Sequence, residues 1–230
     1  MNIIFKEFGD FNIYNTIDIK NVGEFLNKPK IYNPDANFKY CTIINTIKNL
    51  DIKIENLLEP GCADCILSAF LCKLYDIKTV YLFDFVTVRG INIEKRQNEI
   101  FNFNKISTNI IFKGGDFFSR ITEIENNSIS IIIDGCSVTH FMGTDGLNCW
   151  KKAANCFYDK LKMFGYVVIS TDVLYNENIE IEGSKGEFLY PKDIINCFNN
   201  KFMMISTPIF SGKVSHFPHL RCITVCFKKL

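Results

Sequence analysis

Five acidic residues stand where short apolar stretches of the sequence end, and their placement is the first indication of chemistry. Glu59 ends N-L-L-E, Asp84 ends T-V-Y-L-F-D, Asp116 follows I-I-F-K-G-G, Asp134 ends S-I-S-I-I-I-D and Asp172 ends Y-V-V-I-S-T-D. The preference of Asp for turns is enough to explain any one of them. Five carboxylates at one edge of a single sheet would instead surround the place where a ligand binds.

Strand and helix patterns alternate along the part of the chain that carries these acids. β-branched and aromatic runs predict strands at 54–59, 79–84, 109–113, 128–134 and 166–172. Helical patterns predict helices at 37–50, 64–75, 91–103, 147–163 and 191–199. Two last strands, at 203–210 and 221–227, have no helix between them and are expected to pair as a long hairpin.

This alternation predicts an α/β fold in which helices cover both faces of a mostly parallel sheet. The closing pair of strands adds one antiparallel strand at the carboxyl-terminal end of the chain. In such sheets ligands bind beyond the carboxyl ends of the strands, at the point where the strand order reverses. The five acids are predicted to lie at that edge.

Composition and charge narrow the classes of function. The chain has 230 residues, 47% of them hydrophobic and 22% charged, with a net charge of +1. This balance disfavours binding to a nucleic-acid backbone by charge alone. The absence of a long apolar run disfavours a membrane span. The start of the chain is a poor secretory signal, so we expect a cytoplasmic protein whose ten cysteines stay reduced.

Several of these segments resemble the class I S-adenosylmethionine-dependent methyltransferases, over roughly residues 54 to 172. L-L-E-P-G-C-A-D is similar to the first motif of that family, Y-L-F-D-F to its second strand, and G-G-D-F-F to its adenine-side motif. I-I-I-D-G-C-S-V-T-H-F is similar to the fourth strand and the loop after it, and L-K-M-F-G-Y-V-V-I-S to the turn into the fifth. The resemblance implies a three-layer α/β/α sandwich around a Rossmann-like sheet of seven strands.

The resemblance also implies S-adenosyl-L-methionine as cofactor and assigns roles around it. Glu59 would face the cofactor's ammonium, Asp84 its ribose hydroxyls and Asp116 its adenine amino group. The turn at 60–64 would offer backbone N–H groups to the cofactor's carboxylate. The implied cofactor contacts are Glu59, Gly61, Ala63, Asp84, Phe85, Asp116, Phe117, Asp134 and Gly135.

The turn departs from the family pattern at three positions. Ala63 and Cys65 stand in place of two glycines, and Pro60 removes one N–H donor. Ala63 would still allow a close backbone approach if its φ is negative. The run G-C-A-D-C-I also lacks the G-x-G-x-x-G of nicotinamide dinucleotide sites, which disfavours the alternative of an oxidoreductase on a related sheet.

Cys62 and Cys65 could instead be metal ligands or a redox pair. A zinc site needs a second pair of ligands, and Cys222 and Cys226 are the nearest match in spacing. A divalent cation between Asp134 and Asp172 is a further alternative, as in metal-assisted O-methyltransferases.

The acceptor side is expected around the three histidines of the chain. His140 follows the fourth strand of the motif series and is the candidate general base or acceptor-orienting group. His216 and His219 lie in the predicted closing hairpin and are candidate substrate contacts. The segment 175–188 is a candidate lid, with Gly183 and Gly186 as hinges.

We therefore expect one methyltransferase domain over residues 1–230, with a cap at 1–50, a cofactor-binding core at 51–172 and acceptor-side loops at 173–230. Its acceptor would be a hydroxyl or amine of a small molecule, such as a sugar-linked metabolite, with no nucleic-acid or membrane partner. A cofactor-binding subunit without catalysis remains an alternative, and the oligomeric state stays open.

Overall fold

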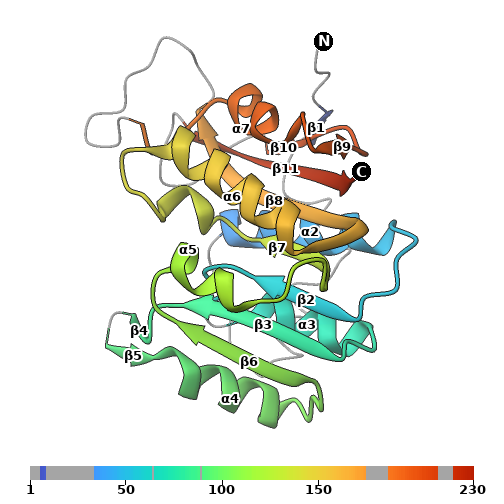
Figure 1. Ribbon diagram of the computed structural model, residues 1–230, viewed down its shortest axis with the longest axis vertical. Helices are drawn as coiled ribbons and strands as arrows, with labels where there is room; N and C mark the ends of the chain where they lie inside the picture. Colours follow the sequence, from blue (N-terminus) through green and yellow to red (C-terminus); the bar gives the residue numbers. More distant parts are fainter. Residues whose placement is uncertain (1–5, 9–33, 64, 89, 175–185, 212–219) are drawn as a thin grey trace.

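A single large sheet organises the protein. The computed structural model describes residues 6–8, 34–63, 65–88, 90–174, 186–211 and 220–230. In those residues the strand order is β1-β10-β11-β8-β7-β2-β3-β6, with β9 also paired to β11 (Figure 1). The strands of this sheet are β1 (Lys6–Phe8), β2 (Asn56–Glu59), β3 (Thr79–Asp84), β6 (Asn109–Gly114), β7 (Ile129–Asp134), β8 (Leu161–Leu174), β9 (Phe202–Met204), β10 (Ile209–Ser211) and β11 (Leu220–Lys229).

The centre of the sheet is parallel, as the sequence predicts. β2 pairs in parallel with β3 and with β7, β3 pairs with β6, and β7 pairs with β8. β11 runs antiparallel to β8 over nine residue pairs, from Leu220↔Leu174 to Lys228↔Tyr166. The carboxyl ends of β2, β3, β6 and β7 therefore meet at one edge.

The predicted closing hairpin is interrupted, which corrects the expectation of one long strand at 203–210. β9 and β10 are separate, and each pairs antiparallel with a different part of β11. Pro208 lies between them and cannot donate a ladder hydrogen bond. Because β8 occupies the other edge of β11, β9 and β10 share one position in the sheet. This gives the seven expected positions, and β1 adds an edge strand beside β10 that the sequence did not indicate.

Helices cover both faces of the sheet, which confirms the three-layer α/β/α class. They are α2 (Pro34–Lys48), α3 (Ile66–Leu74), α4 (Ile93–Phe103), α5 (Phe117–Arg120), α6 (Gly146–Lys160) and α7 (Pro191–Phe198), with short 3₁₀ turns η2 (Ile121–Glu123) and η3 (Val138–His140). One core contains buried residues of α2, α3 and α4 packed on the sheet, and the other contains those of α5, α6 and α7. In Figure 1, α6 lies in front of the sheet and α2 and α3 behind it.

Several predicted boundaries are wrong by two to five residues: α2 begins at Pro34 rather than at 37, α3 at Ile66 rather than at 64, and β8 at Leu161 rather than at 166. Local contacts explain two further differences. α4 begins at Ile93 rather than at 91, because the Asn92 side chain caps it by accepting from Lys95 N at 2.8 Å. The two residues before it pair in the small hairpin of β4 (Thr87–Val88) and β5 (Ile91–Asn92). α6 ends at Lys160 rather than at 163, since β8 already begins at Leu161 beside Ile129.

None of the helices in the described part of the chain has the length and apolar character that a bilayer span requires.

Candidate functional site

A cavity of about 740 Å³ opens where the carboxyl ends of β2, β3, β6 and β7 meet. Its volume lies in the range of pockets for small molecules and cofactors. Eight of the nine predicted cofactor contacts line it, as does His140: these are Glu59, Gly61, Ala63, Asp84, Phe85, Asp116, Phe117 and Gly135. The sequence did not indicate the remaining lining residues as cofactor contacts; they are Tyr40, Cys62, Phe83, Val88, Gly115, Cys136, Ser137 and Phe141.

The turn after β2 has left-handed backbone at three residues. Gly61, Ala63 and Cys65 have φ of +55°, +44° and +50°. A Cβ at Gly61 would lie 2.2 Å from Cβ of Ser137, so only glycine fits there. The condition of a negative φ at Ala63 is not met. Ala63 and Cys65 therefore keep a conformation that glycine usually adopts, at a cost that is a common feature of functional sites.

Three N–H groups in and next to this turn already donate within the protein, which reduces the donors that the expected ligand carboxylate could use. Cys62 N donates to Phe83 O at 2.9 Å, Ala63 N to Oδ2 of Asp84 at 2.7 Å, and Cys65 N to Cys62 O at 2.6 Å. These bonds fasten the turn to the end of β3. A ligand carboxylate would need other donors.

Glu59 is a buried carboxylate at the wall of the cavity, with an exposed fraction of 5%. Burial raises the pKa of Glu59 to about 8, against the smaller opposing effect of the hydrogen bond from the Ser68 hydroxyl in α3. Asp134 and Asp84 raise this pKa further through like-charge repulsion. No cationic side chain in the described residues forms an ion pair with it, so a cationic ligand would supply the missing countercharge.

Asp84 ends β3 with both carboxylate oxygens turned to the backbone around the cavity. Oδ2 accepts from Ala63 N, and Oδ1 accepts from Phe85 N at 2.7 Å. Each oxygen can accept a second hydrogen bond, since a carboxylate has about four acceptor positions. The Phe85 ring beside it is 63% exposed and lines the cavity, so it is accessible to a ligand ring.

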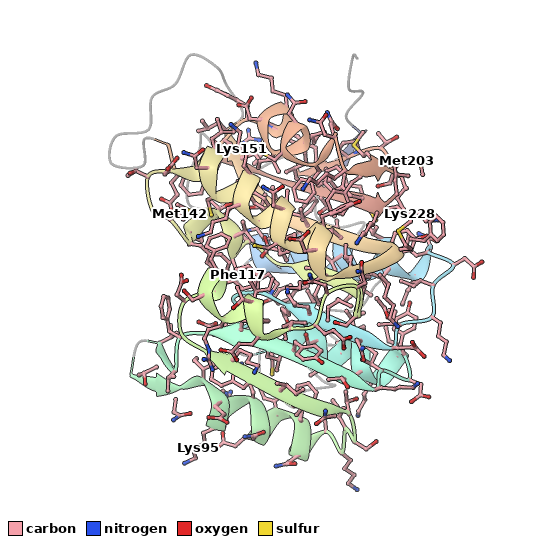
Figure 2. The ribbon with its side chains drawn as sticks, viewed as in Figure 1. Lys95, Phe117, Met142, Lys151, Met203 and Lys228 are labelled. Carbon is pink, nitrogen blue, oxygen red and sulfur yellow. The ribbon has the colours of Figure 1, made fainter. Side chains whose placement is uncertain are left out.

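Asp116 and Phe117 form the wall that follows β6. Oδ1 of Asp116 caps α5 by accepting from Ser119 N at 2.8 Å and Ser119 Oγ at 2.7 Å, which leaves Oδ2 as the oxygen for a ligand. Phe117 is buried and stacks on Phe141, with ring centroids 5.1 Å apart. Figure 2 labels Phe117 and Met142 at the same side of the molecule, where the strands end.

Asp134 does not line the cavity, although it was predicted as a cofactor contact. Its fully buried carboxylate accepts from Ser137 N at 2.8 Å and Ser137 Oγ at 2.5 Å. Ser137 Oγ is also 2.6 Å from Pro60 O. Asp134 therefore shapes the loop after β7 and fastens it to the turn after β2. Burial raises the pKa of Asp134, and the bonds from Ser137 oppose this rise.

Helix α2 brings two residues to the site that its apolar stripe did not indicate. Tyr40 of α2 lines the cavity, and its ring lies 3.3 Å from where a Cβ on Gly135 would be. Lys39 is buried and pairs with Asp172 at 2.9 Å. Because these partners are 133 positions apart in sequence, periodicity alone could not have found the pair.

Asp172 is held by protein groups rather than placed for a cation. Besides Lys39, it accepts from Cys136 Sγ at 3.2 Å and from Cys222 Sγ at 3.1 Å. Its carboxylate and that of Asp134 thus each have partners within the protein. In the described ranges no group of three or more His, Cys, Asp or Glu side chains is arranged to hold a metal ion. All ten cysteines lie in the described residues, and none of them, Cys62 and Cys65 included, forms a disulfide bond.

His140 lies at the end of η3 on the rim of the cavity, and its Nδ1 bonds to Oε1 of Glu187. The sequence reasoning placed residue 187 in a lid without a role. Gly186 has φ of +86°, and its carbonyl accepts from Gly146 N at 2.6 Å, so it is docked on α6. His216, His219 and Gly183 lie outside the described residues.

Comparisons with known proteins identify the fold. No family model and no curated protein matches the sequence. Among solved structures, a SAM dependent methyltransferase from Aquifex aeolicus matches with a TM-score of 0.60 and 13% identity, over 96% of this chain and 99% of that one. A second match is geranyl diphosphate C-methyltransferase from Streptomyces coelicolor A3(2), solved with S-adenosyl-L-homocysteine. Its TM-score is 0.64 at 7% identity, over 82% of this chain and 75% of that one. The MccD protein matches with a TM-score of 0.67 and 14% identity, over 86% of this chain and 99% of that one.

At these identities the comparisons establish architecture. The chain has the fold of the class I, Rossmann-like S-adenosylmethionine-dependent methyltransferases.

Proposed function

We propose that the protein is an S-adenosylmethionine-dependent methyltransferase that acts on a small-molecule acceptor. The observation that carries this proposal is the charge of the cavity. Three carboxylates line it, those of Glu59, Asp84 and Asp116, and no Lys or Arg is among its described lining residues. Such a lining attracts a cationic ligand and repels a pyrophosphate.

The residues present fit this cofactor. Glu59, buried without a cationic partner in the described residues, would hold the ammonium. Asp84 would accept from the ribose hydroxyls, and Oδ2 of Asp116 from the adenine amino group. Phe85 and Phe117 would pack on the adenine. Gly61, Ala63 and Gly135 would give the ligand room at the backbone.

The bound cofactor would supply an electrophilic methyl group, and the protein's task would be to align an acceptor with it. His140 lies on the cavity rim, where it would orient the acceptor or take its proton. The predicted contacts of His216 and His219 with the acceptor remain proposals. We also retain as proposals a single domain over residues 1–230 and a cytoplasmic location. The sugar-linked acceptor remains a proposal too, with an oxygen or nitrogen as the methylated atom.

Isothermal titration of S-adenosylmethionine into the protein tests this function. We expect a dissociation constant in the micromolar range and no binding of NADH. Asp84→Asn keeps an acceptor for Ala63 N but removes the charge. It should weaken S-adenosylmethionine binding by about 10- to 100-fold, since hydrogen bonds to charged groups contribute about 1.5–3 kcal/mol.

The matched control is Asp51→Ala, which removes an exposed carboxylate outside the cavity and should leave binding unchanged. Binding of NADH in preference to S-adenosylmethionine would favour the oxidoreductase alternative. Binding of S-adenosylmethionine without transfer to any acceptor would favour the non-catalytic subunit.

A further inference from the structure

The pairing of His140 with Glu187 assigns a role to a residue that the sequence left without one. Nδ1 of His140 bonds to the Glu187 carboxylate. The ring of Phe188 meets the His140 ring edge-on, with centroids 6.0 Å apart. Two consecutive residues of one segment therefore hold the imidazole, and they leave Nε2 as the nitrogen available to a ligand.

The segment that carries Glu187 is locked in place by two glycines. Gly146 N, at the start of α6, donates to Gly186 O at 2.6 Å. A Cβ on Gly186 would lie 2.0 Å from Thr144 O, and a Cβ on Gly146 would lie 2.4 Å from both Gly186 O and Glu187 O. Leu174 N donates to Leu189 O at 3.0 Å and ties the segment to the end of β8. An ordinary surface ion pair does not require such close backbone docking.

The other side of the pair is equally fixed. His140 ends η3, whose preceding turn is bonded to the buried carboxylate of Asp134 through Ser137 N and Val138 N. His140 itself lines the cavity, with a half-exposed side chain. His140 thus lines the cavity while its Nδ1 is bonded to Glu187, which is the arrangement of a base with an orienting carboxylate.

We infer that Glu187 is a positioning residue that keeps the proton of His140 on Nδ1, so that Nε2 accepts a proton from the methyl acceptor; this inference rests on the proposed function. The acceptor group is then a hydroxyl. A hydroxyl must lose its proton as it attacks, whereas a neutral amine attacks with its own lone pair. The hydroxyl oxygen forms the new bond to the methyl carbon, and its proton moves to Nε2. The electron pair of the broken carbon–sulfur bond stays on the donor's sulfur, and Glu187 stabilises the imidazolium that forms.

Nitrogen NMR of the full-length protein tests the tautomer without an acceptor. The chain has three histidines, and the spectrum of His140→Asn identifies the signals of His140. At a pH where the His140 ring is neutral, we expect the native protein to carry the ring proton on Nδ1 and none on Nε2. Glu187→Gln should shift this ring toward a mixture of tautomers. A native ring protonated mainly on Nε2, or a ring unaffected by Glu187→Gln, would overturn the inference.

Transfer assays give the second readout. The probes are methyl-labelled S-adenosylmethionine with a set of small phenols and alcohols, and a parallel set of primary amines. We expect labelled products from the hydroxyl set. His140→Asn should lower kcat by about 10²- to 10⁴-fold, the usual contribution of a general base. Glu187→Gln should lower kcat with little change in KM, and Glu187→Asp should recover part of it.

Titration with S-adenosylmethionine separates failure of the Glu187 inference from failure of the proposed function. If the native protein does not bind S-adenosylmethionine, the proposed function fails. If binding is normal in Glu187→Gln but products come only from the amine set, or kcat is unchanged, the role of Glu187 is refuted while the proposed function stands.

Discussion

Burial of Glu59 predicts how both the free energy of unfolding and the binding of the ligand depend on pH. Burial raises the pKa of Glu59 from 4.5 to about 8. Between these values the folded protein keeps a proton that the unfolded chain has released, so the free energy of unfolding falls as the pH rises. Between pH 5 and pH 8 the loss from this group is on the order of 3 kcal/mol.

Glu59→Gln should remove this loss. A glutamine oxygen can still accept from the Ser68 hydroxyl, and it carries no charge to bury. In urea denaturation at pH 5, 6, 7 and 8, the free energy of unfolding of the variant should therefore rise relative to that of the native protein as the pH rises. At pH 8 the variant should melt higher by roughly 6–12 °C, at about 2–4 °C per kcal/mol for a chain of this size. Groups that do not interact with Glu59 titrate alike in both proteins and cancel in the difference.

Glu55→Gln is the matched control, since Glu55 precedes the same strand but is held by Lys162 and Lys78. Those lysines lower the pKa of Glu55 to about 2, so its contribution to stability appears above the unfolded value and is lost only in acid. Its variant should differ from the native protein by an offset that stays constant from pH 5 to 8. Parallel pH dependence in Glu59→Gln and the native protein would refute the reasoning.

The change in proton binding that accompanies ligand binding gives a second test of Glu59. An ammonium held by Glu59 requires the ionised carboxylate, so binding of S-adenosylmethionine at pH 6.5 should release a proton. Titrations in buffers of different ionisation enthalpy measure this release, which Glu59→Gln should abolish together with most of the affinity. Proton uptake, or no change in proton binding, would contradict the assigned contact.

Three further changes test the walls of the cavity. Gly61→Ala should lower the melting temperature and abolish S-adenosylmethionine binding, because its Cβ would lie 2.2 Å from Ser137. Gly90→Ala is the control for backbone strain alone, since Gly90 has φ of +78° but no atom within 4 Å of an added Cβ. Ala63→Gly should raise the free energy of unfolding by about 0.5–1 kcal/mol in urea titrations, by relieving a φ of +44°; a loss of stability would show that the methyl group makes a needed contact. Phe85→Ala should weaken binding in calorimetry without lowering the melting temperature, since the ring is 63% exposed; unchanged affinity would exclude this ring from the adenine contact.

The local sequence determined the elements better than the contacts between them. The strand Thr79–Asp84 has the predicted bounds, because its run of β-branched and aromatic residues begins after Lys78 and ends at the acid Asp84. Three of the five strand-end acids, Glu59, Asp84 and Asp116, line one cavity because parallel strands end at the same edge. The roles of the acids were not equally readable. Asp134 ends an apolar strand just as Asp84 does, yet its carboxylate accepts a hydrogen bond from Ser137 and does not line the cavity.

Contacts between distant segments escaped prediction for a physical reason. The periodicity of α2 marks the face that packs on the sheet, but it does not say that Lys39 reaches Asp172 or that Tyr40 reaches Gly135. The left-handed φ of Ala63 is set by the bonds that fasten its turn to β3, and alanine gives no local sign of it. Glu187 meets His140 only because Gly186 and Gly146 let two segments dock.

A crystal structure of the protein grown with S-adenosyl-L-homocysteine tests the central claim most directly. We predict the ribose hydroxyls within hydrogen-bond distance of Asp84, the ammonium at Glu59 and the adenine against Phe85 and Phe117. Density for the ligand elsewhere, or in the cavity with its ribose away from Asp84, would contradict the proposed cofactor site.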